Sequence, residues 1–204
     1  MMFDADRVAA RFVTEPGRAT TEKTRIFGDG RQIARTDRES RTELAETTVR
    51  ATLSGIKAVI GEAHAVMVSD YAKGVVGRAL WAQVVEWAAA TGKPVIADPK
   101  GADFSMYRGA TVLTPNASEL AIATGSPVGS NAEIESAALA VMKSASIGAM
   151  VVTRGQDGLS IISGLGAAVH IGTLARDAID VSGAGDTVAA ALAAALAVGA
   201  DLVD

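Results

Sequence analysis

Short apolar runs alternate with helical segments along most of this chain of 204 residues, at intervals of about 25 to 30 residues. Apolar residues at helical spacing predict helices, and the runs between them predict buried strands. We expect helices at residues 43–63, 78–91, 131–144 and 188–198, with a shorter one from Asn116. Strands are expected at residues 64–69, 94–97, 110–114, 149–153, 159–163 and 168–171. This order is typical of an α/β fold with a mainly parallel central sheet and helices on both faces.

Residues 21–37 show a different pattern, in which two short segments flank the turn Gly28-Asp29-Gly30. Such a pattern predicts a β hairpin that stands outside the α/β alternation. Lys and Arg residues alternate with apolar residues along it, so one face could cover a ligand while the other meets a second copy of the chain. We therefore predict that residues 1–204 form one domain, in which this hairpin acts as a lid or as a homodimer contact.

The composition excludes several classes of protein. The formal net charge is −4 and the isoelectric point is about 5.2, so the chain has no broad positive field for nucleic acid or an anionic membrane surface. It has no cysteine, which rules out disulfides, thiolate zinc sites and cysteine nucleophiles. Charged residues interrupt the start of the chain and no long apolar run follows, so we expect neither a signal peptide nor a membrane span. A cytoplasmic protein is the expectation.

Polar side chains follow four of the predicted strands, at the point where each strand ends. They are Asp70, then Asp98 and Lys100, then Asn116, then Thr153 and Arg154. In a parallel sheet the carboxyl ends of the strands share one edge, and ligands bind there. We therefore predict a single cleft lined by these side chains.

The segment 180–187 reads D-V-S-G-A-G-D-T and precedes an Ala- and Leu-rich helix. The backbone N–H groups of Gly183, Ala184 and Gly185 would lie at the positive end of the helix dipole, an arrangement suited to binding a phosphoryl group. Asp186 would place a carboxylate beside that anion hole, where it could accept the proton of an attacking hydroxyl. The alternative is a glycine-rich loop whose acidic residue only stabilises the helix dipole.

This motif resembles the signature of the ribokinase, or pfkB-type, carbohydrate kinases. Four further segments are similar to the branch of that family that acts on heptose 7-phosphate: S-D-Y-A-K-G at 69–74, A-D-P-K-G at 97–101, Y-R-G-A-T-V-L-T-P-N-A-S-E at 107–119 and V-T-R-G at 152–155. The resemblance implies a ribokinase-like fold with ATP and Mg2+ bound. It also implies phosphorylation of the anomeric hydroxyl of D-glycero-D-manno-heptose 7-phosphate to the 1,7-bisphosphate, a precursor of ADP-heptose and the lipopolysaccharide core.

The resemblance also implies roles for single residues. Asp186 matches the catalytic base of the family, and Gly183 to Gly185 match its anion hole. Other matching positions would bind the nucleotide and its Mg2+, with Glu119 acting through water: Asn116, Ala117, Ser118, Glu119, Thr153, Arg154 and Gly155. Asp180 matches a loop that binds a monovalent cation such as K+ in relatives.

Several charged residues are candidates for binding the sugar phosphate, and each has a simpler alternative. The candidates are Asp70, Lys73, Asp98, Lys100 and Arg108. Lys and Arg donate charge-assisted hydrogen bonds to phosphate, but most of them are solvated surface charges. Asn116 with Glu119 also fits a helix capping box that needs no ligand, and we expect both roles together.

Two family segments have no counterpart in this sequence: an initial strand with G-D-x-x-x-D and a G-G-x-x-x-N segment that grips the sugar. The chain also stops soon after the signature helix, at Asp204. We therefore expect the sequence to lack parts of the domain at both ends. Two alternatives remain open, namely another sugar kinase of this fold, such as a fructokinase or phosphofructokinase, and a non-catalytic nucleotide-binding fragment. A dinucleotide-dependent oxidoreductase is disfavoured, because no G-x-G-x-x-G lies between a strand and a helix.

Overall fold

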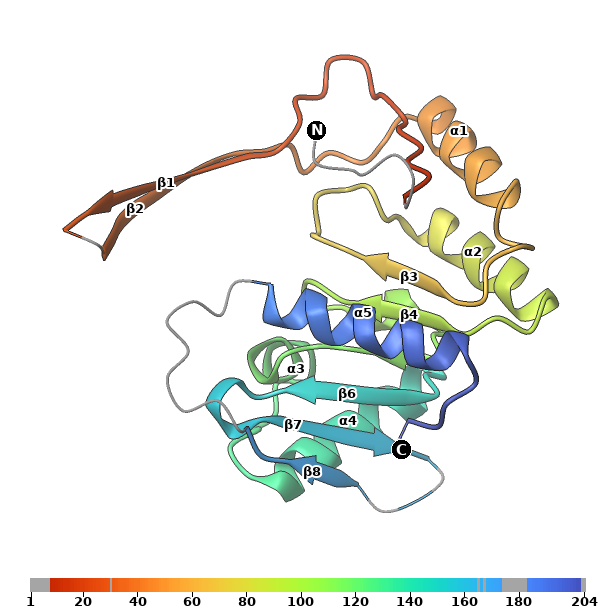
Figure 1. The fold of residues 1–204 in the computed structure, drawn as a ribbon. Coiled ribbons are helices and arrows are strands. Elements are labelled where there is room, and N and C mark those ends of the chain that lie inside the picture. Colours follow the sequence, from red (N-terminus) through yellow and green to blue (C-terminus); the bar gives the residue numbers. More distant parts are fainter. Residues whose placement is uncertain (1–7, 30, 165, 167, 174–182, 203–204) are drawn as a thin grey trace.

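A computed structural model describes residues 8–29, 31–164, 166, 168–173 and 183–202 of the chain, and Figure 1 shows its fold. The central sheet has six strands: β3 (Val66–Ser69), β4 (Val95–Asp98), β5 (Val112–Leu113), β6 (Ala149–Thr153), β7 (Leu159–Ser163) and β8 (Val169–Ile171). The helices are α1 (Glu46–Lys57), α2 (Arg78–Ala90), α3 (Ala117–Thr124), α4 (Asn131–Ala145) and α5 (Ala184–Ala197), with short 3-10 turns η1 (Phe104–Tyr107) and η2 (Gly155–Asp157). A separate hairpin is formed by β1 (Glu22–Gly28) and β2 (Arg31–Arg38).

The strands of the central sheet lie side by side in chain order. β3, β4, β5 and β6 run parallel, and β7 and β8 add two antiparallel strands at one edge. Right-handed crossovers that all step in the same direction place their helices on the same face of a sheet. The helices α2, α3 and α4 accordingly lie on one face, and α5, which follows β8, lies on the opposite face (Figure 1).

Each face of the sheet buries its own core. Alternate residues of a strand point to opposite faces of the sheet, so each central strand contributes side chains to both cores. On the face of α2, α3 and α4 the core includes Trp81, Leu120, Ile134, Val95, Leu113 and Met150. On the face of α5 it includes Ile96, Val112, Val151, Val188, Leu192 and Leu196. All four residues of β4 are buried, as expected for a strand covered on both sides.

The hairpin β1–β2 projects away from the body of the molecule (Figure 1). Every residue of β2 is exposed, so neither face of this two-stranded sheet is covered. Arg25 lies directly opposite Arg35 across the two strands, and like charges at such a pair are unfavourable. Lys23 and Arg35 both contact Asp37, at 3.1 and 2.9 Å, which offsets part of that repulsion.

The structure confirms the predicted fold class and the predicted hairpin. Two helices differ substantially in their ends: α1 (Glu46–Lys57) is shorter than the predicted 43–63, and α5 begins at Ala184 and not near residue 188. The turn η1 was not predicted. No helix among the described residues is long and apolar enough to span a membrane.

Candidate active site at the carboxyl edge of the sheet

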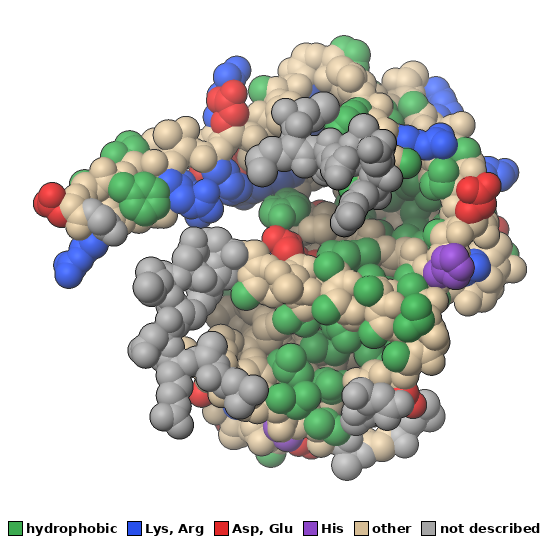
Figure 2. Space-filling view, viewed as in Figure 1, with side chains coloured by type: hydrophobic (Ala, Val, Ile, Leu, Met, Phe, Trp, Pro, Cys, Tyr) green, Lys and Arg blue, Asp and Glu red, His purple; other side chains and the backbone are tan. Residues whose placement is uncertain are grey.

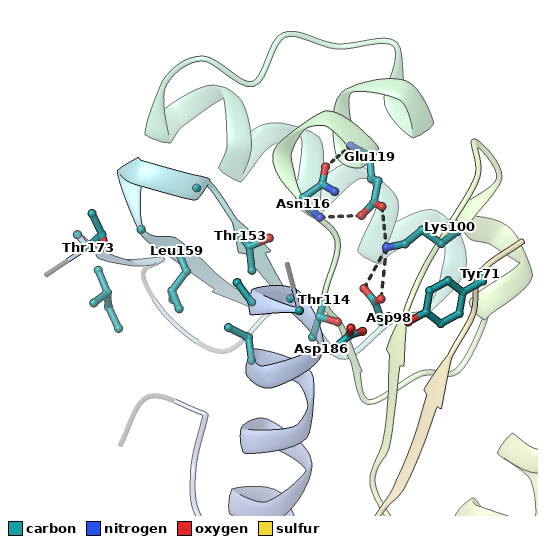
Figure 3. Close-up of a pocket in the computed structure, with 18 residues that line it drawn as sticks. Tyr71, Asp98, Lys100, Thr114, Asn116, Glu119, Thr153, Leu159, Thr173 and Asp186 are labelled. Carbon is teal, nitrogen blue, oxygen red and sulfur yellow. Dashed lines mark hydrogen bonds and ion pairs between the residues drawn. The ribbon is translucent and has the colours of Figure 1, made fainter. Parts of the chain in front are cut away.

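A cleft of about 620 Å³ lies where the carboxyl ends of the parallel strands meet the N-terminus of α5. Figure 3 shows side chains from the strand ends, such as Asp98, and from the start of α5, such as Asp186, at this cleft. Its lining includes ten residues predicted from the sequence: Asp98, Lys100, Asn116, Glu119, Thr153, Gly155, Gly183, Ala184, Gly185 and Asp186. The strand ends and the glycine turn thus belong to one cavity.

The N-terminus of α5 presents backbone N–H groups to this cleft. Gly183 caps the helix with φ +81°, a left-handed conformation that glycine adopts without strain. Its carbonyl accepts the first helical bonds, from the backbone N–H and the hydroxyl of Thr187, both at 2.9 Å. The N–H groups of Ala184, Gly185 and Asp186 donate to no other described residue. This arrangement can accept the oxygens of a phosphate.

The carboxylate of Asp186 is exposed at the same helix end and lines the cleft. In Figure 3 it lies between Thr114 and Asp98. Its negative charge is one of the contributions that raise the pKa of Asp98. A carboxylate so placed can orient a hydroxyl group and accept its proton.

Lys100 joins the two sides of the cleft. Its Nζ atom lies 2.7 Å from Oε1 of Glu119 and 3.3 Å from Oδ2 of Asp98, and Figure 3 shows these contacts side by side. Burial would lower the pKa of Lys100, but the hydrogen bond to Glu119 and the charges of both carboxylates outweigh it, so the pKa is raised. Burial raises the pKa of Asp98, against the opposing effect of Lys100. Lys100 therefore carries a stable positive charge into a cleft whose other charged residues, Asp98, Glu119 and Asp186, are acidic.

Asn116 and Glu119 form the capping box of α3. The Asn116 side chain accepts from the Glu119 N–H at 2.9 Å, and Oε2 of Glu119 accepts from the Asn116 N–H at 2.9 Å. The other carboxylate oxygen of Glu119 contacts Lys100. Both oxygens are thus engaged by the protein, a donor set that suits contact with a metal ion through water and not direct ligation.

The remaining nucleotide-side candidates lie at the end of β6 and in the first turn of α3. Thr153 and Gly155 line the cleft, whereas Ala117 and Ser118 do not. Arg154, also outside the lining, donates to the side chain of Asn131 at 2.7 Å. Asp180, the candidate for a monovalent cation, lies outside the described residues.

Three of the sugar-phosphate candidates have protein partners and do not line the cleft. Asp70 is 3% exposed and accepts from the Tyr107 hydroxyl at 2.7 Å. Lys73 pairs with Glu39 at 2.6 Å, near the base of the hairpin. The Arg108 guanidinium donates at the C-terminal end of α4, to the Ser144 carbonyl at 2.9 Å and the Ser146 hydroxyl at 3.0 Å.

Sequence reasoning missed eight residues of the lining. These are Tyr71, Thr114, Gly158, Leu159, Ile171, Gly172, Thr173 and Val188. Tyr71 follows Asp70, and Thr114 ends the predicted strand 110–114, so the rule of strand ends could have found them. The others lie in or directly beside the antiparallel strands β7 and β8, or in α5, and the sequence pattern offered no reason to select them.

Comparison with known proteins gives one family over nearly the whole chain. The sequence profile of the pfkB family carbohydrate kinases matches residues 2–204. Among curated proteins, the chain is similar to the bifunctional protein HldE of Paramagnetospirillum magneticum, with 46% identity over 190 residues, which are 93% of this chain and 39% of that protein. It is also similar to the bifunctional protein HldE of Rhodospirillum rubrum, with 41% identity over 202 residues, or 99% of this chain and 41% of that protein. The chain thus spans about two fifths of the length of these relatives.

Solved structures show the same fold at low sequence identity. The Escherichia coli phosphofructokinase-2 in complex with potassium matches with a TM-score of 0.75 and 20% identity, covering 91% of this chain and 60% of that one. The Arabidopsis thaliana ribokinase complexed with ribose and ATP matches with a TM-score of 0.64 and 21% identity, covering 85% and 55%.

Proposed function

Because the chain belongs to the pfkB family of carbohydrate kinases, we propose that its cleft transfers the γ-phosphate of ATP to a sugar hydroxyl with Asp186 as the base. The observation that carries this proposal is the meeting of three features in one cavity. They are the backbone amides at the start of α5, the adjoining Asp186 carboxylate, and the ammonium group of Lys100. Phosphoryl transfer needs little more from a protein than alignment and neutralisation of charge.

In the proposed step the sugar hydroxyl gives its proton to a carboxylate oxygen of Asp186. The hydroxyl oxygen forms a bond to the γ-phosphorus, and the bond from that phosphorus to the bridging oxygen breaks, which leaves its electron pair on ADP. The amides of Gly183 to Gly185 and the ammonium of Lys100 would hold the transferring oxygens. Mg2+ bound with ATP would neutralise charge on the phosphates, and Glu119 would reach it through water.

The proposed acceptor is D-glycero-D-manno-heptose 7-phosphate, phosphorylated on its anomeric hydroxyl. Two observations support this choice: the strand-end segments 69–74, 97–101, 107–119 and 152–155, which resemble the heptose branch of the family, and the identity of 46% to a bifunctional protein HldE. A fructokinase or phosphofructokinase activity is the alternative, since solved structures of similar fold include phosphofructokinase-2. A monovalent cation is proposed as well, because one of these structures contains potassium.

A substrate panel tests this proposal. The purified chain, with ATP and Mg2+ in K+ or Na+ buffer, would be offered heptose 7-phosphate, fructose, fructose 6-phosphate and ribose, and the products identified by 31P NMR. We expect a new anomeric phosphate on the heptose phosphate and a higher rate in K+. Preference for fructose or fructose 6-phosphate would favour the alternative kinases. Binding of ATP without transfer to any sugar would instead indicate a non-catalytic nucleotide-binding fragment.

We also propose that the hairpin pairs with the hairpin of a second copy. An isolated two-stranded hairpin is marginally stable in water, and this one exposes Phe27 by 62% and Ile33 by 71%. Sedimentation should give a dimer, and Ile33→Asp should shift it to a monomer, whereas the matched change Val59→Asp at an exposed residue outside the hairpin should not. A monomeric wild type at micromolar concentration would rule the pairing out.

A further inference from the structure

The hydroxyl of Tyr107 lies buried beneath the cleft, between the carboxyl ends of β3 and β4. Tyr107 is fully buried at the end of η1. Its ring packs edge-on against Trp81, with centroids 5.4 Å apart at 85°, and against Phe104, at 6.3 Å and 72°. Two aromatic neighbours on the core side therefore fix where the hydroxyl can be.

That hydroxyl connects two neighbouring turns. It lies 2.7 Å from Oδ2 of Asp70, which follows β3, and 3.1 Å from the backbone N–H of Lys100, which follows β4. A carboxylate only accepts hydrogen bonds, so the phenolic proton is directed to Asp70, and an oxygen lone pair is left for the Lys100 N–H. The Lys100 carbonyl, at 3.3 Å, is a more distant and weaker acceptor. The pKa of Tyr107 is raised, because the hydroxyl is buried and adjoins Asp70, so the proton stays in place.

Asp70, held by the Tyr107 hydroxyl, in turn holds the backbone of the turn that follows β3. Its Oδ1 accepts from the N–H of Ala72 at 2.8 Å, and its own N–H donates to the carbonyl of Asp98 at 3.1 Å. Ala72 has φ +51°, an unfavourable conformation for a residue other than glycine. Between these two residues stands Tyr71, which lines the cleft. A strained turn next to a site persists only where its surroundings hold it.

We propose that Tyr107 is a positioning residue, whose single hydroxyl sets the turn of Lys100 and, through Asp70, the turn of Tyr71. Both turns lie on the side of the cleft formed by β3 and β4, away from the nucleotide candidates at the end of β6. The expected effect on kcat rests on the proposed function, whereas the expected effect on the two turns does not. Small displacements of an aligned group are costly, since about 1 Å can reduce a rate by about 10²-fold.

Tyr107→Phe tests the inference, because it keeps the ring and removes the hydroxyl. Trp81→Phe is the matched control, since it disturbs the same aromatic cluster and removes the 3.0 Å bond from the Trp81 indole to the Arg108 carbonyl, on the side away from the cleft. Hydrogen exchange at the amides of Lys100 and Ala72 is measured first, because it requires no activity. We expect Tyr107→Phe, and not Trp81→Phe, to speed exchange at both amides by about tenfold or more.

The kinetic measurement then compares the same variants. We expect Tyr107→Phe to lower kcat by about tenfold while the KM for ATP stays within about twofold. In a Lys100→Met background the same change should lower kcat by much less, because only the route through Asp70 to the turn of Tyr71 remains. Should Tyr107→Phe not fold, Asp70→Asn, which keeps the shape but loses one of the two accepted bonds, is expected to change exchange and kcat in the same direction.

The results separate this inference from the proposed function. Unchanged exchange at Lys100 and Ala72, or equal changes in Trp81→Phe, would overturn the positioning role whatever the activity. A wild type that phosphorylates no sugar would overturn the proposed function, while the exchange data would still decide the positioning role. Additive losses in Tyr107→Phe and Lys100→Met would contradict action through Lys100.

Discussion

The Nζ atom of Lys100 lies 2.7 Å from Oε1 of Glu119, which links the turn after β4 to the first turn of α3. The same ammonium group contacts Asp98 at 3.3 Å, so a single cation holds two acidic side chains at the cleft. Phosphate oxygens could replace either carboxylate as its partner, since both kinds of group accept the same charge-assisted bonds. Lys100 therefore connects the end of β4 to the start of α3 across the cleft.

Removing this charge should impair catalysis more than folding. We expect Lys100→Met to lower kcat by about 10²-fold, as for loss of one donor to a transition-state oxygen. Steady-state kinetics on the variant would check this, with Lys143→Met, at an exposed position of α4, as the control. A kcat within about twofold of wild type in Lys100→Met would exclude a role for this ammonium in transfer.

The raised pKa of Lys100 should make the free energy of unfolding depend on pH. Because its folded pKa is raised above the ordinary value of 10.5, its contribution to stability is fully present below pH 10.5 and is lost as the pH rises through the folded pKa. Urea unfolding from pH 8.5 to 12 should therefore show a difference between wild type and Lys100→Met that shrinks at the upper end. A difference that grows with pH would contradict the expected sign.

Gly183 and Gly199 offer a matched pair at the two ends of α5. Their φ angles are +81° and +80°, and a Cβ atom at either position would meet no atom of the described residues within 4 Å. Replacement by Ala should therefore destabilise the protein at each site by a similar amount, about 1 kcal/mol, through backbone strain alone. Only Gly183→Ala should also lower kcat, because it displaces the amides that face the cleft. Equal kinetics in the two variants would mean that the helix start has no role in the reaction.

A chain of hydrogen bonds, buried only at Ser160, ties α4 to the antiparallel edge of the sheet. The Ser160 hydroxyl, fully buried, lies 2.8 Å from Nδ1 of His170, and Nε2 of His170 lies 2.8 Å from Glu135. A carboxylate can only accept, so Nε2 donates to Glu135 and, in the neutral ring, Nδ1 accepts from Ser160. His170→Ala should cost about 1–3 kcal/mol in urea unfolding, because the buried Ser160 O–H loses its acceptor and keeps only the 3.4 Å bond that it accepts from Arg154. Ser160→Ala in that background should recover part of the loss, and a purely additive double variant would refute the coupling.

The sequence predicted most of the fold because its signals are local. The strands β3, β4 and β6 are short apolar runs that end at polar residues, and capping residues such as Asn116 mark helix starts. The parallel order then brings Asp98, Lys100 and Asn116 to one edge, as the shared geometry of strand ends requires.

The direction of a charged side chain could not be predicted in the same way. Arg108 and Lys73 stand in segments that resemble the family, yet each pairs with a group far along the chain, at α4 and at Glu39. Tyr107 was overlooked for the opposite reason, since an aromatic residue in an apolar segment gives no sign that its hydroxyl reaches Asp70, 37 positions away. Such pairings depend on the packed structure, and a local pattern does not contain them.

The direct test of the central claim is the rate of a single turnover in Asp186→Asn. With enzyme in excess over ATP and saturating heptose 7-phosphate, we predict that the transfer rate falls by about 10²–10⁴-fold, while the Kd for ATP measured by calorimetry stays within about twofold. Asp201→Asn, just beyond the other end of α5, should transfer at the wild-type rate. Transfer by Asp186→Asn at a rate close to that of wild type would contradict the claim that this carboxylate activates the sugar hydroxyl.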